Sequence, residues 1–271
     1  MFTWNVNPEI MQIGPLALRY YSLLFATGLI SAYLTLRWIY KKEKKTPDEA
    51  DTLALYIIIG AVIGARLGHT LFYEFSYYSK HIAEIFLPWH GTIGKNFEFT
   101  GYQGLSSHGG AIGVILALLI FVKRYKSNLL WIADRLAICI PLTAGFVRLG
   151  NLMNSEIIGQ PSNLPWAFIF QRIDDIPRHP TQLYESLSYF TVFLLLLILY
   201  KHKKLINQQG QLSGLFLTIL FSLRFLIEFA KENQEAFENN WILDMGQILS
   251  IPFILFGLFL ITKKSFIKNA K

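Results

Sequence analysis

The sequence predicts an all-α, polytopic integral membrane protein with seven transmembrane helices. Hydrophobic residues make up 53% of the 271-residue chain and charged residues only 16%, well below the roughly 25% that is typical of soluble domains. The apolar residues gather in seven runs that are long enough to cross a bilayer, which takes about 20 residues. These runs lack the alternation over about ten residues that the strands of a membrane barrel need.

The seven expected helices form one transmembrane domain that covers residues 1–271. An open sheet would leave unpaired backbone groups in lipid, so each run is interpreted as a helix. The N-terminal segment lacks a basic stretch and a small-residue cleavage site, so we expect the first span to stay in the mature protein. Cys139, the only cysteine, is interpreted as a packing residue. The expected spans are 16–40, 52–73, 106–122, 129–149, 182–200, 212–230 and 242–262.

The lysines and arginines predict how the helices are oriented. More than half of the 25 basic residues follow the first, third, fifth and seventh spans, within 41–45, 123–126, 201–204 and 263–271. Basic loops stay in the cytoplasm, so we expect the N-terminus outside and the C-terminus inside. We interpret the net charge of +7 as this topology signal and expect no nucleic-acid partner. The opposite loops hold only Lys80, Lys95, Arg172, Arg178 and Lys231.

Two long loops are expected on the outer side, from about residue 75 to 105 and from about 150 to 181. Both are rich in aromatic residues, which favour the head-group level of a membrane. The second and third spans also carry glycines four residues apart, and small residues at this spacing let helices approach closely. These glycines are Gly60, Gly64 and Gly68 on the second span and Gly109 and Gly113 on the third.

Ionisable residues inside the spans mark candidate sites, because a charge at membrane depth costs several kcal/mol. Arg224 and Glu228 lie four residues apart in the sixth span, so they share a helix face. They fit either an internal ion pair or a ligand site. Glu185 lies early in the fifth span. Structural roles are favoured for two further pairs, Arg66 with His69 and Asp134 with Arg135.

His108 is a candidate proton acceptor. It lies in the stretch S-S-H-G-G-A-I-G, where the third span begins on the outer side. A helix start presents free N–H groups and favours the neutral form of a histidine, which can accept a proton.

A second dense stretch, G-F-V-R-L-G-N-L-M-N-S-E-I-I-G, covers residues 145–159. Arg148, Asn151 and Asn154 are three residues apart, so they form one polar ridge if the helix continues, and Glu156 follows. Arginine gives planar, bidentate recognition of phosphate or carboxylate. A third stretch, R-H-P-T-Q-L-Y-E at 178–185, places Pro180 where a helix is expected to start.

Together these residues indicate a membrane enzyme or carrier that binds the phosphate of a phospholipid head group on the outer side. A transporter would place ionisable groups along a path through the bilayer midplane, whereas here they crowd the outer half. A rhomboid-like protease would need a G-x-S-G helix, and the chain has no such tetrapeptide. A binding or assembly protein would not need this polar cluster.

The motifs resemble those of the prolipoprotein diacylglyceryl transferase family, and the resemblance covers nearly the whole chain. The strongest match is G-x-x-R-x-x-N-x-x-N-x-E-x-x-G at 145–159. The others are H-G-G-x-I-G at 108–113, G-A-R-L-G-x-x-L-F-Y at 64–73, H-P-T-Q-L-Y-E at 179–185 and R-F-x-x-E-F at 224–229.

The resemblance implies a transferase of the bacterial inner membrane with its active site toward the outer leaflet. Such an enzyme moves the diacylglyceryl group of phosphatidylglycerol to the lipobox cysteine of a prolipoprotein signal peptide. A thioether forms, glycerol phosphate leaves, and no metal or soluble cofactor takes part. Membrane lipids surround both substrates.

The resemblance also assigns residues. His108 is implied as the base, and Arg148 and Arg224 as the residues that hold the head group. The other implied positions are Tyr21, Asn151, Asn154, Glu156, Gly159 and Glu228. The sequence departs from the family at Leu220 and His69, where tyrosine is common.

Overall fold

The computed structural model describes residues 1–14, 16–87, 89–92, 95–99, 104–202, 208–232 and 242–263. Several expected features lie outside these residues: Gly101 to Gln103 in the outer loop, and Lys203, Lys204, Lys264, Lys268 and Lys271 among the basic residues. In the described part, seven helices are long and apolar enough to cross a membrane, which confirms the predicted spans. They are α1 (Tyr20–Lys42), α2 (Pro47–Phe72), α4 (Ser107–Tyr125), α5 (Leu129–Asn154), α6 (Thr181–Lys201), α7 (Gln211–Glu228) and α8 (Met245–Thr262).

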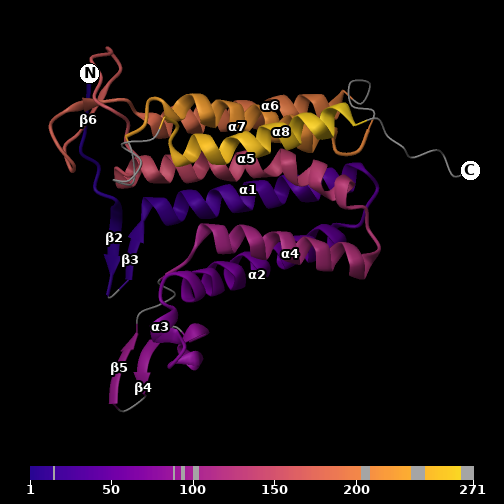
Figure 1. Cartoon of the computed structure of the whole chain (residues 1–271), viewed down its shortest axis with the longest axis horizontal. Coiled ribbons are helices and arrows are strands. Elements are labelled where there is room, and N and C mark those ends of the chain that lie inside the picture. Colours follow the sequence, from indigo (N-terminus) through magenta and orange to yellow (C-terminus); the bar gives the residue numbers. More distant parts are fainter. Residues whose placement is uncertain are drawn as a thin grey trace, which may run out of the picture. The chain divides into compact units, whose positions relative to one another are not determined.

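The chain divides into two compact units. The first contains residues 1–39 and 130–271, and the second contains residues 40–129. In the first unit, most of α1 runs beside α5, in one bundle with α6, α7 and α8 (Figure 1). The second unit is built around α2 and α4, which pack against each other.

Close backbone approaches hold the helices of the first unit together. Between α1 and α5, Thr143 Oγ1 donates a hydrogen bond to the Gly28 carbonyl at 3.1 Å. Between α7 and α8, a Cβ atom on Gly214 would lie only 2.7 Å from the carbonyl oxygen of Gly257. Small residues at these crossings therefore let neighbouring backbones touch, as is common in membrane bundles.

Asp134 has a structural role at the start of α7. Its carboxylate is 2% exposed and accepts hydrogen bonds from the backbone N–H groups of Gly210 and Ser213 at 2.7 and 2.8 Å. The first N–H groups of a helix have no partner within the helix, so this buried carboxylate satisfies them from a neighbouring span. The structural interpretation of Asp134 is thus confirmed.

The glycines of the second unit form the contact between α2 and α4. A Cβ atom on Gly68 would lie 2.6 Å from the Gly109 Cα atom, and one on Gly64 would lie 2.7 Å from the Gly113 Cα atom. Any side chain at these positions would push the two backbones apart. The predicted close packing of these spans is confirmed.

Arg66 fixes the segment that follows α2. Its guanidinium is 5% exposed and donates to the carbonyl oxygens of Ile85 and Glu84 at 2.8 and 2.9 Å. These acceptors belong to the short helix η1 (Ile82–Ile85), which follows α3 (Phe75–Tyr78). In the same segment, Tyr77 donates to the Glu84 carboxylate at 2.7 Å, and this hydrogen bond raises the pKa of Tyr77 to about 12.

Short strands occur in the N-terminal segment, at the start of the expected first span and in the two expected outer loops. β1 (Phe2–Trp4), β6 (Phe168–Phe170) and β7 (Pro177–Arg178) form a three-stranded sheet, in which β1 and β6 are parallel. β2 (Glu9–Ile13) pairs with β3 (Leu16–Arg19), and β4 (Trp89–Thr92) pairs with β5 (Lys95–Phe99). The first helix accordingly begins at Tyr20 rather than at residue 16, because β3 uses residues 16–19 for the hairpin.

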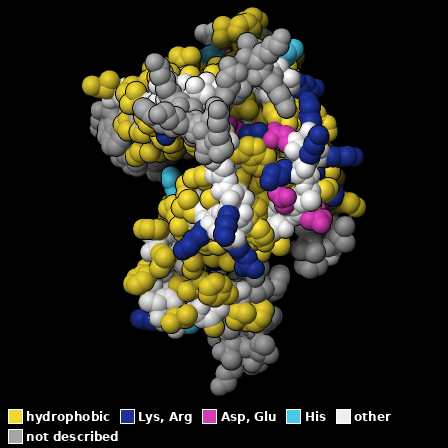
Figure 2. Space-filling model, turned by 90° about the vertical axis from the view of Figure 1, so that its right-hand side faces the viewer, with side chains coloured by type: hydrophobic (Ala, Val, Ile, Leu, Met, Phe, Trp, Pro, Cys, Tyr) yellow, Lys and Arg dark blue, Asp and Glu magenta, His cyan; other side chains and the backbone are white. Residues whose placement is uncertain are grey.

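The described basic clusters lie at one end of the helices within each unit. In the first unit, Lys201 and Lys263 lie at the C-terminal ends of α6 and α8. In the second, Lys45 precedes α2, and Lys123 and Arg124 lie in the last turn of α4. Figure 2 looks onto the end of the first unit where α6 and α8 end, and lysine and arginine side chains gather there.

Candidate functional site

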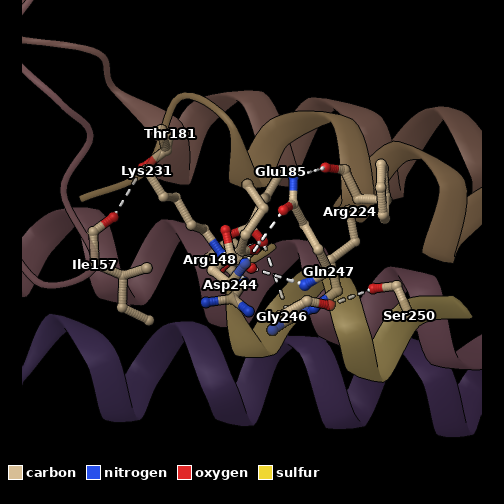
Figure 3. A network of polar contacts seen from close by, with 12 residues as sticks. Arg148, Ile157, Thr181, Glu185, Arg224, Lys231, Asp244, Gly246, Gln247 and Ser250 are labelled. Carbon is tan, nitrogen blue, oxygen red and sulfur yellow. Dashed lines mark hydrogen bonds and ion pairs between the residues drawn. The ribbon is translucent and has the colours of Figure 1, made fainter. Parts of the chain in front are cut away.

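The polar cluster of the first unit lies where α5 and α7 end and where α6 and α8 begin (Figure 3). Arg148 is six residues before the end of α5, and Glu185 is four residues after the start of α6. At 1.5 Å per residue, both lie about 6 to 9 Å inside the helix ends. The site is therefore within the membrane-spanning bundle but close to one of its surfaces, opposite the end that carries Lys201 and Lys263.

Glu185 is the centre of the cluster, and its side chain is 0% exposed. Arg148 Nε lies 3.0 Å from Glu185 Oε2, and Lys231 Nζ lies 3.0 Å from Oε1. Arg224 Nη1 approaches the same Oε1 atom at 3.9 Å. One carboxylate thus gathers cations from α5, from α7 and from the residues that follow α7.

Glu228 is the second carboxylate of the cluster. Its Oε2 atom accepts a hydrogen bond from Lys231 Nζ at 2.9 Å. A Cβ atom on Gly246 would lie 2.5 Å from the Glu228 carboxyl carbon, so the absence of a side chain there makes room for this carboxylate at the start of α8. Arg148, Arg224 and Lys231 against Glu185 and Glu228 leave one unbalanced positive charge.

A chain of hydrogen bonds leads from Arg148 toward the surface. Arg148 Nη1 donates to Asn151 Oδ1 at 3.3 Å, and Asn151 Nδ2 donates to Glu156 Oε2 at 3.1 Å. The other oxygen of Glu156 accepts from Asn154 Nδ2 at 3.1 Å. The predicted polar ridge exists because α5 continues to Asn154. Glu156 follows the helix and is exposed.

The turn after α5 has an unusual backbone conformation. Ser155 and Ile157 have φ angles of +56° and +57°, which cost of order 1 to 3 kcal/mol each for residues with a side chain. The start of α6 holds this turn: Thr181 Oγ1 donates to the Ile157 carbonyl at 2.9 Å, and Gln182 Nε2 to the Glu156 carbonyl at 2.6 Å. The H-P-T-Q-L-Y-E stretch therefore supplies both the hydrogen bonds that fix the turn and the central Glu185.

Gly159 positions Lys231 through the backbone. It forms an isolated β-bridge with Lys231, and a Cβ atom there would lie 2.5 Å from the His179 Cβ atom and 2.7 Å from the Ala230 carbonyl oxygen. Only glycine fits between these chains. Gly159 thus brings Lys231 close to the polar cluster.

The neighbouring segment is held by Arg178. Its Nη1 atom donates to the Gly159 carbonyl at 3.3 Å, and its Nε atom donates to the Asp174 carboxylate at 3.1 Å. The hydrogen bonds from the Arg178 guanidinium lower the pKa of Asp174.

Tyr21 and His108 have different surroundings. Tyr21 lies in the first turn of α1, and its ring covers Gly150 of α5, where a Cβ atom would lie 2.8 Å from Tyr21 Cδ2. His108 belongs to the second unit, in the first turn of α4, and it is exposed. The helix start is capped by Ser106, whose Oγ atom accepts from the Gly109 N–H group at 3.3 Å, so the predicted helix start at His108 is confirmed.

Sequence reasoning missed the central place of Glu185 and the role of Lys231. The pattern of basic residues assigns Lys231 to an outer loop, yet its side chain is 3% exposed and pairs with two carboxylates. The available signal was its position three residues after Glu228 at the end of a span. Arg224 and Glu228 share a helix, as predicted, but among the described residues Glu228 forms its ion pair with Lys231, whereas Arg224 approaches Glu185. Among the described residues, no group of three or more His, Cys, Asp or Glu side chains is arranged to hold a metal ion.

Comparison with known proteins places the chain in a family. The model of the prolipoprotein diacylglyceryl transferase family matches residues 8–263. The chain belongs to this family. It is 48% identical over 261 residues to the phosphatidylglycerol--prolipoprotein diacylglyceryl transferase of Tolumonas auensis, and this match covers 96% of each chain.

Two further relatives carry the same name. The protein of Bacteroides fragilis is 45% identical, with 94% of this chain and 92% of the relative covered. That of Chloroherpeton thalassium is 42% identical, with 95% and 92% covered. This member of the prolipoprotein diacylglyceryl transferase family is therefore an enzyme of lipoprotein biosynthesis, and its seven apolar helices fit a multi-pass membrane protein.

The central role of Glu185 gives a prediction for stability. Glu185→Gln keeps the side-chain shape but leaves Arg148, Arg224 and Lys231 with Glu228 as their remaining carboxylate partner. Breaking a buried ion pair by removing one partner costs about 3 to 5 kcal/mol. We expect a clear fall of the thermal unfolding midpoint of the purified protein in detergent.

The matched control is Glu49→Gln. Glu49 pairs with Lys45 at 3.4 Å, and both side chains are more than 40% exposed, so its loss is worth about 1 kcal/mol or less. Equal unfolding midpoints for the two variants would contradict the central role of Glu185.

Proposed function

We propose that this chain transfers the diacylglyceryl group of phosphatidylglycerol to a cysteine thiol of prolipoproteins, the first step of lipoprotein maturation. The accepting cysteine lies in the lipobox of the signal peptide. Family membership and the names of the relatives support this function.

The unbalanced positive charge of the buried cluster carries the proposal. The phosphodiester of phosphatidylglycerol has one negative charge, which matches the one positive charge left by Arg148, Arg224, Lys231, Glu185 and Glu228. A lone anion inside a bundle is costly unless it is paired. Arg148 and Arg224 are 15% and 28% exposed, so both retain surface for a ligand, whereas Lys231 at 3% exposure acts as their buried support.

The chemistry follows from these charges. The substrate thiolate attacks the glyceryl carbon that carries the phosphate, a C–S bond forms, and the C–O bond to the phosphate breaks. Glycerol phosphate leaves with the electron pair of that bond. Negative charge builds up on the phosphate oxygens in the transition state, and cations fixed in position before the reaction stabilise it.

His108 is the proposed base for the thiol proton. The thiolate is the reactive form of a cysteine, and a neutral imidazole at the exposed start of α4 can accept the proton. Asn151 accepts a hydrogen bond from Arg148, and Glu156 and Asn154 extend this chain. Tyr21 borders the site over Gly150, and Gly159 positions Lys231.

The active site is proposed to face the outer leaflet of the bacterial inner membrane. The cluster lies at the helix ends opposite Lys201 and Lys263, and basic ends stay in the cytoplasm. An alkaline phosphatase fused after Lys201 is expected to be inactive, because the phosphatase would remain in the cytoplasm, where it does not become active. If this fusion were active and a fusion near residue 165 were inactive, the proposed orientation in the membrane would be wrong.

The two arginines give a prediction for catalysis. Arg148→Ala and Arg224→Ala are each expected to lower transfer from phosphatidylglycerol to a lipobox peptide by at least about 10² to 10³, the typical loss for one stabilising donor. Lysine at either position should not fully rescue the rate, because it lacks the bidentate fork of arginine.

Arg124→Ala is the control. It changes an exposed arginine in the last turn of α4, outside the proposed site, and should retain normal transfer. The unfolding midpoint of each variant separates loss of catalysis from loss of folding. Near-normal transfer by Arg148→Ala would refute the assignment of the head-group site.

The role of His108 can be tested through pH. His108→Gln is expected to lower transfer by about 10² to 10⁴, the usual contribution of a general base. Raising the pH toward the thiol pKa of about 8.5 should restore part of the rate, because the thiolate then forms without a base. His202→Gln, at the exposed end of α6, serves as the control. A loss that stays constant above pH 8, together with a lower unfolding midpoint, would indicate that His108 only anchors its segment.

A further inference from the structure

A polar pocket of about 480 Å³ lies in the first unit, just beyond Asn154 and Glu156. Its size falls in the usual range for small-molecule sites, roughly 300 to 1,000 Å³. We call it the outer polar pocket. It shares Asn154 and Glu156 with the hydrogen-bond chain that begins at the partly exposed Arg148, so it opens where the proposed head-group site ends.

The N-terminal segment builds one wall of this pocket. Trp4 Nε1 donates to the Leu152 carbonyl of α5 at 3.0 Å, which places the following Asn5 beside the end of that helix. Asn7 Oδ1 accepts from the Glu9 N–H group at 3.0 Å. Asn5, Asn7 and Glu9 all line the pocket, so this wall offers amide and carboxylate groups.

Two arginines complete the lining. Arg19 lies opposite Glu9 in the β2–β3 hairpin, and its Nη2 atom is 3.1 Å from Glu9 Oε1. Arg172 follows β6, and the backbone N–H of Gln171 just before it donates to the Trp4 carbonyl at 3.1 Å. Both arginines are exposed and line the pocket.

The chemistry of the lining fits a phosphorylated polyol. Arginine is suited to phosphate, and asparagine amides and carboxylates can donate to or accept from hydroxyl groups. The lining comes from segments outside the spans and from the last residues of α5. A water-soluble molecule can therefore occupy the pocket, whereas a lipid tail gains nothing from its polar walls.

We propose that the outer polar pocket receives the glycerol phosphate that transfer releases. The inference rests on the proposed function. When the C–O bond breaks, the phosphate changes from a diester with one charge to a monoester with a charge of about −1.5 to −2 at neutral pH. The buried cluster offers one unbalanced positive charge, so the product is no longer matched there. In the pocket lining Arg19 pairs with Glu9, and the two arginines balance Glu9 and Glu156 in charge. What the pocket offers the product is therefore a charge-assisted hydrogen bond from Arg172 and amide groups for its hydroxyls, rather than net positive charge.

The test uses the purified full chain in detergent and the variant Arg172→Gln. Titration calorimetry measures the binding of glycerol phosphate, with inorganic phosphate and glycerol as comparison ligands. The transfer assay, on the same preparations, measures inhibition by glycerol phosphate and the KM for phosphatidylglycerol. Lys80→Gln, which changes an exposed lysine outside the pocket, is the matched control.

We expect the wild type to bind glycerol phosphate more tightly than either comparison ligand. Arg172→Gln should weaken binding and inhibition about tenfold, as for one charge-assisted hydrogen bond, with the KM for phosphatidylglycerol within twofold of the wild-type value. Lys80→Gln should leave all three quantities unchanged.

Three outcomes would overturn the proposal. The wild type could transfer lipid without binding glycerol phosphate at millimolar concentration, or Arg172→Gln could bind it as the wild type does. The variant could also raise the KM for phosphatidylglycerol by the same factor as the inhibition constant, which would assign the pocket to the substrate head group. Failure of the wild type to transfer lipid would instead refute the proposed function, and the binding titration would still decide whether Arg172 holds glycerol phosphate.

Discussion

The first unit depends on one buried carboxylate. Without Glu185, the positive charges of Arg148, Arg224 and Lys231 would lie close together in a medium that screens them weakly. With it, side chains from three parts of the chain are fixed around a shared centre. The same carboxylate does not neutralise the cluster, even together with Glu228. The ion pairs with Glu185 and Glu228 stabilise the bundle, and the positive charge that remains is the one that the proposed head-group phosphate would balance.

The backbone turn after α5 and the first turn of α6 hold each other in position beside Glu185. Ser155 and Ile157 adopt left-handed backbone conformations, which are unfavourable for residues that have a side chain. Thr181 and Gln182 compensate by binding the carbonyl oxygens of that turn, and four residues later the same helix supplies Glu185. A single turn of α6 therefore shapes the neighbouring loop and places the central carboxylate, which explains why the polar residues of this stretch lie so close together in sequence.

The sequence predicted the features that follow from the spacing of residues along single helices. The seven apolar runs form helices, Arg148, Asn151 and Asn154 form one polar ridge, and the glycines of α2 and α4 form a helix contact. It did not predict Lys231 as a member of the cluster, because that place depends on Gly159, which pairs with it from 72 residues earlier. β1 was missed for the same reason, since it finds its partner β6 only in the folded chain. The β2–β3 and β4–β5 hairpins are local, and β3 was missed because residues 16–19 continue the apolar run of the first span.

The pairing of Phe2 with Phe168 sets an order of events during synthesis. At translation rates of about 5 to 20 residues per second, β1 waits roughly 8 to 30 seconds before β6 has been made. Four predicted spans are synthesised in that interval, while the N-terminal strand has no partner in its native sheet. Asn5 and Asn7 reach their places only afterwards, so the wall that they form is completed late in the assembly of the first unit, although these residues are among the first to leave the ribosome.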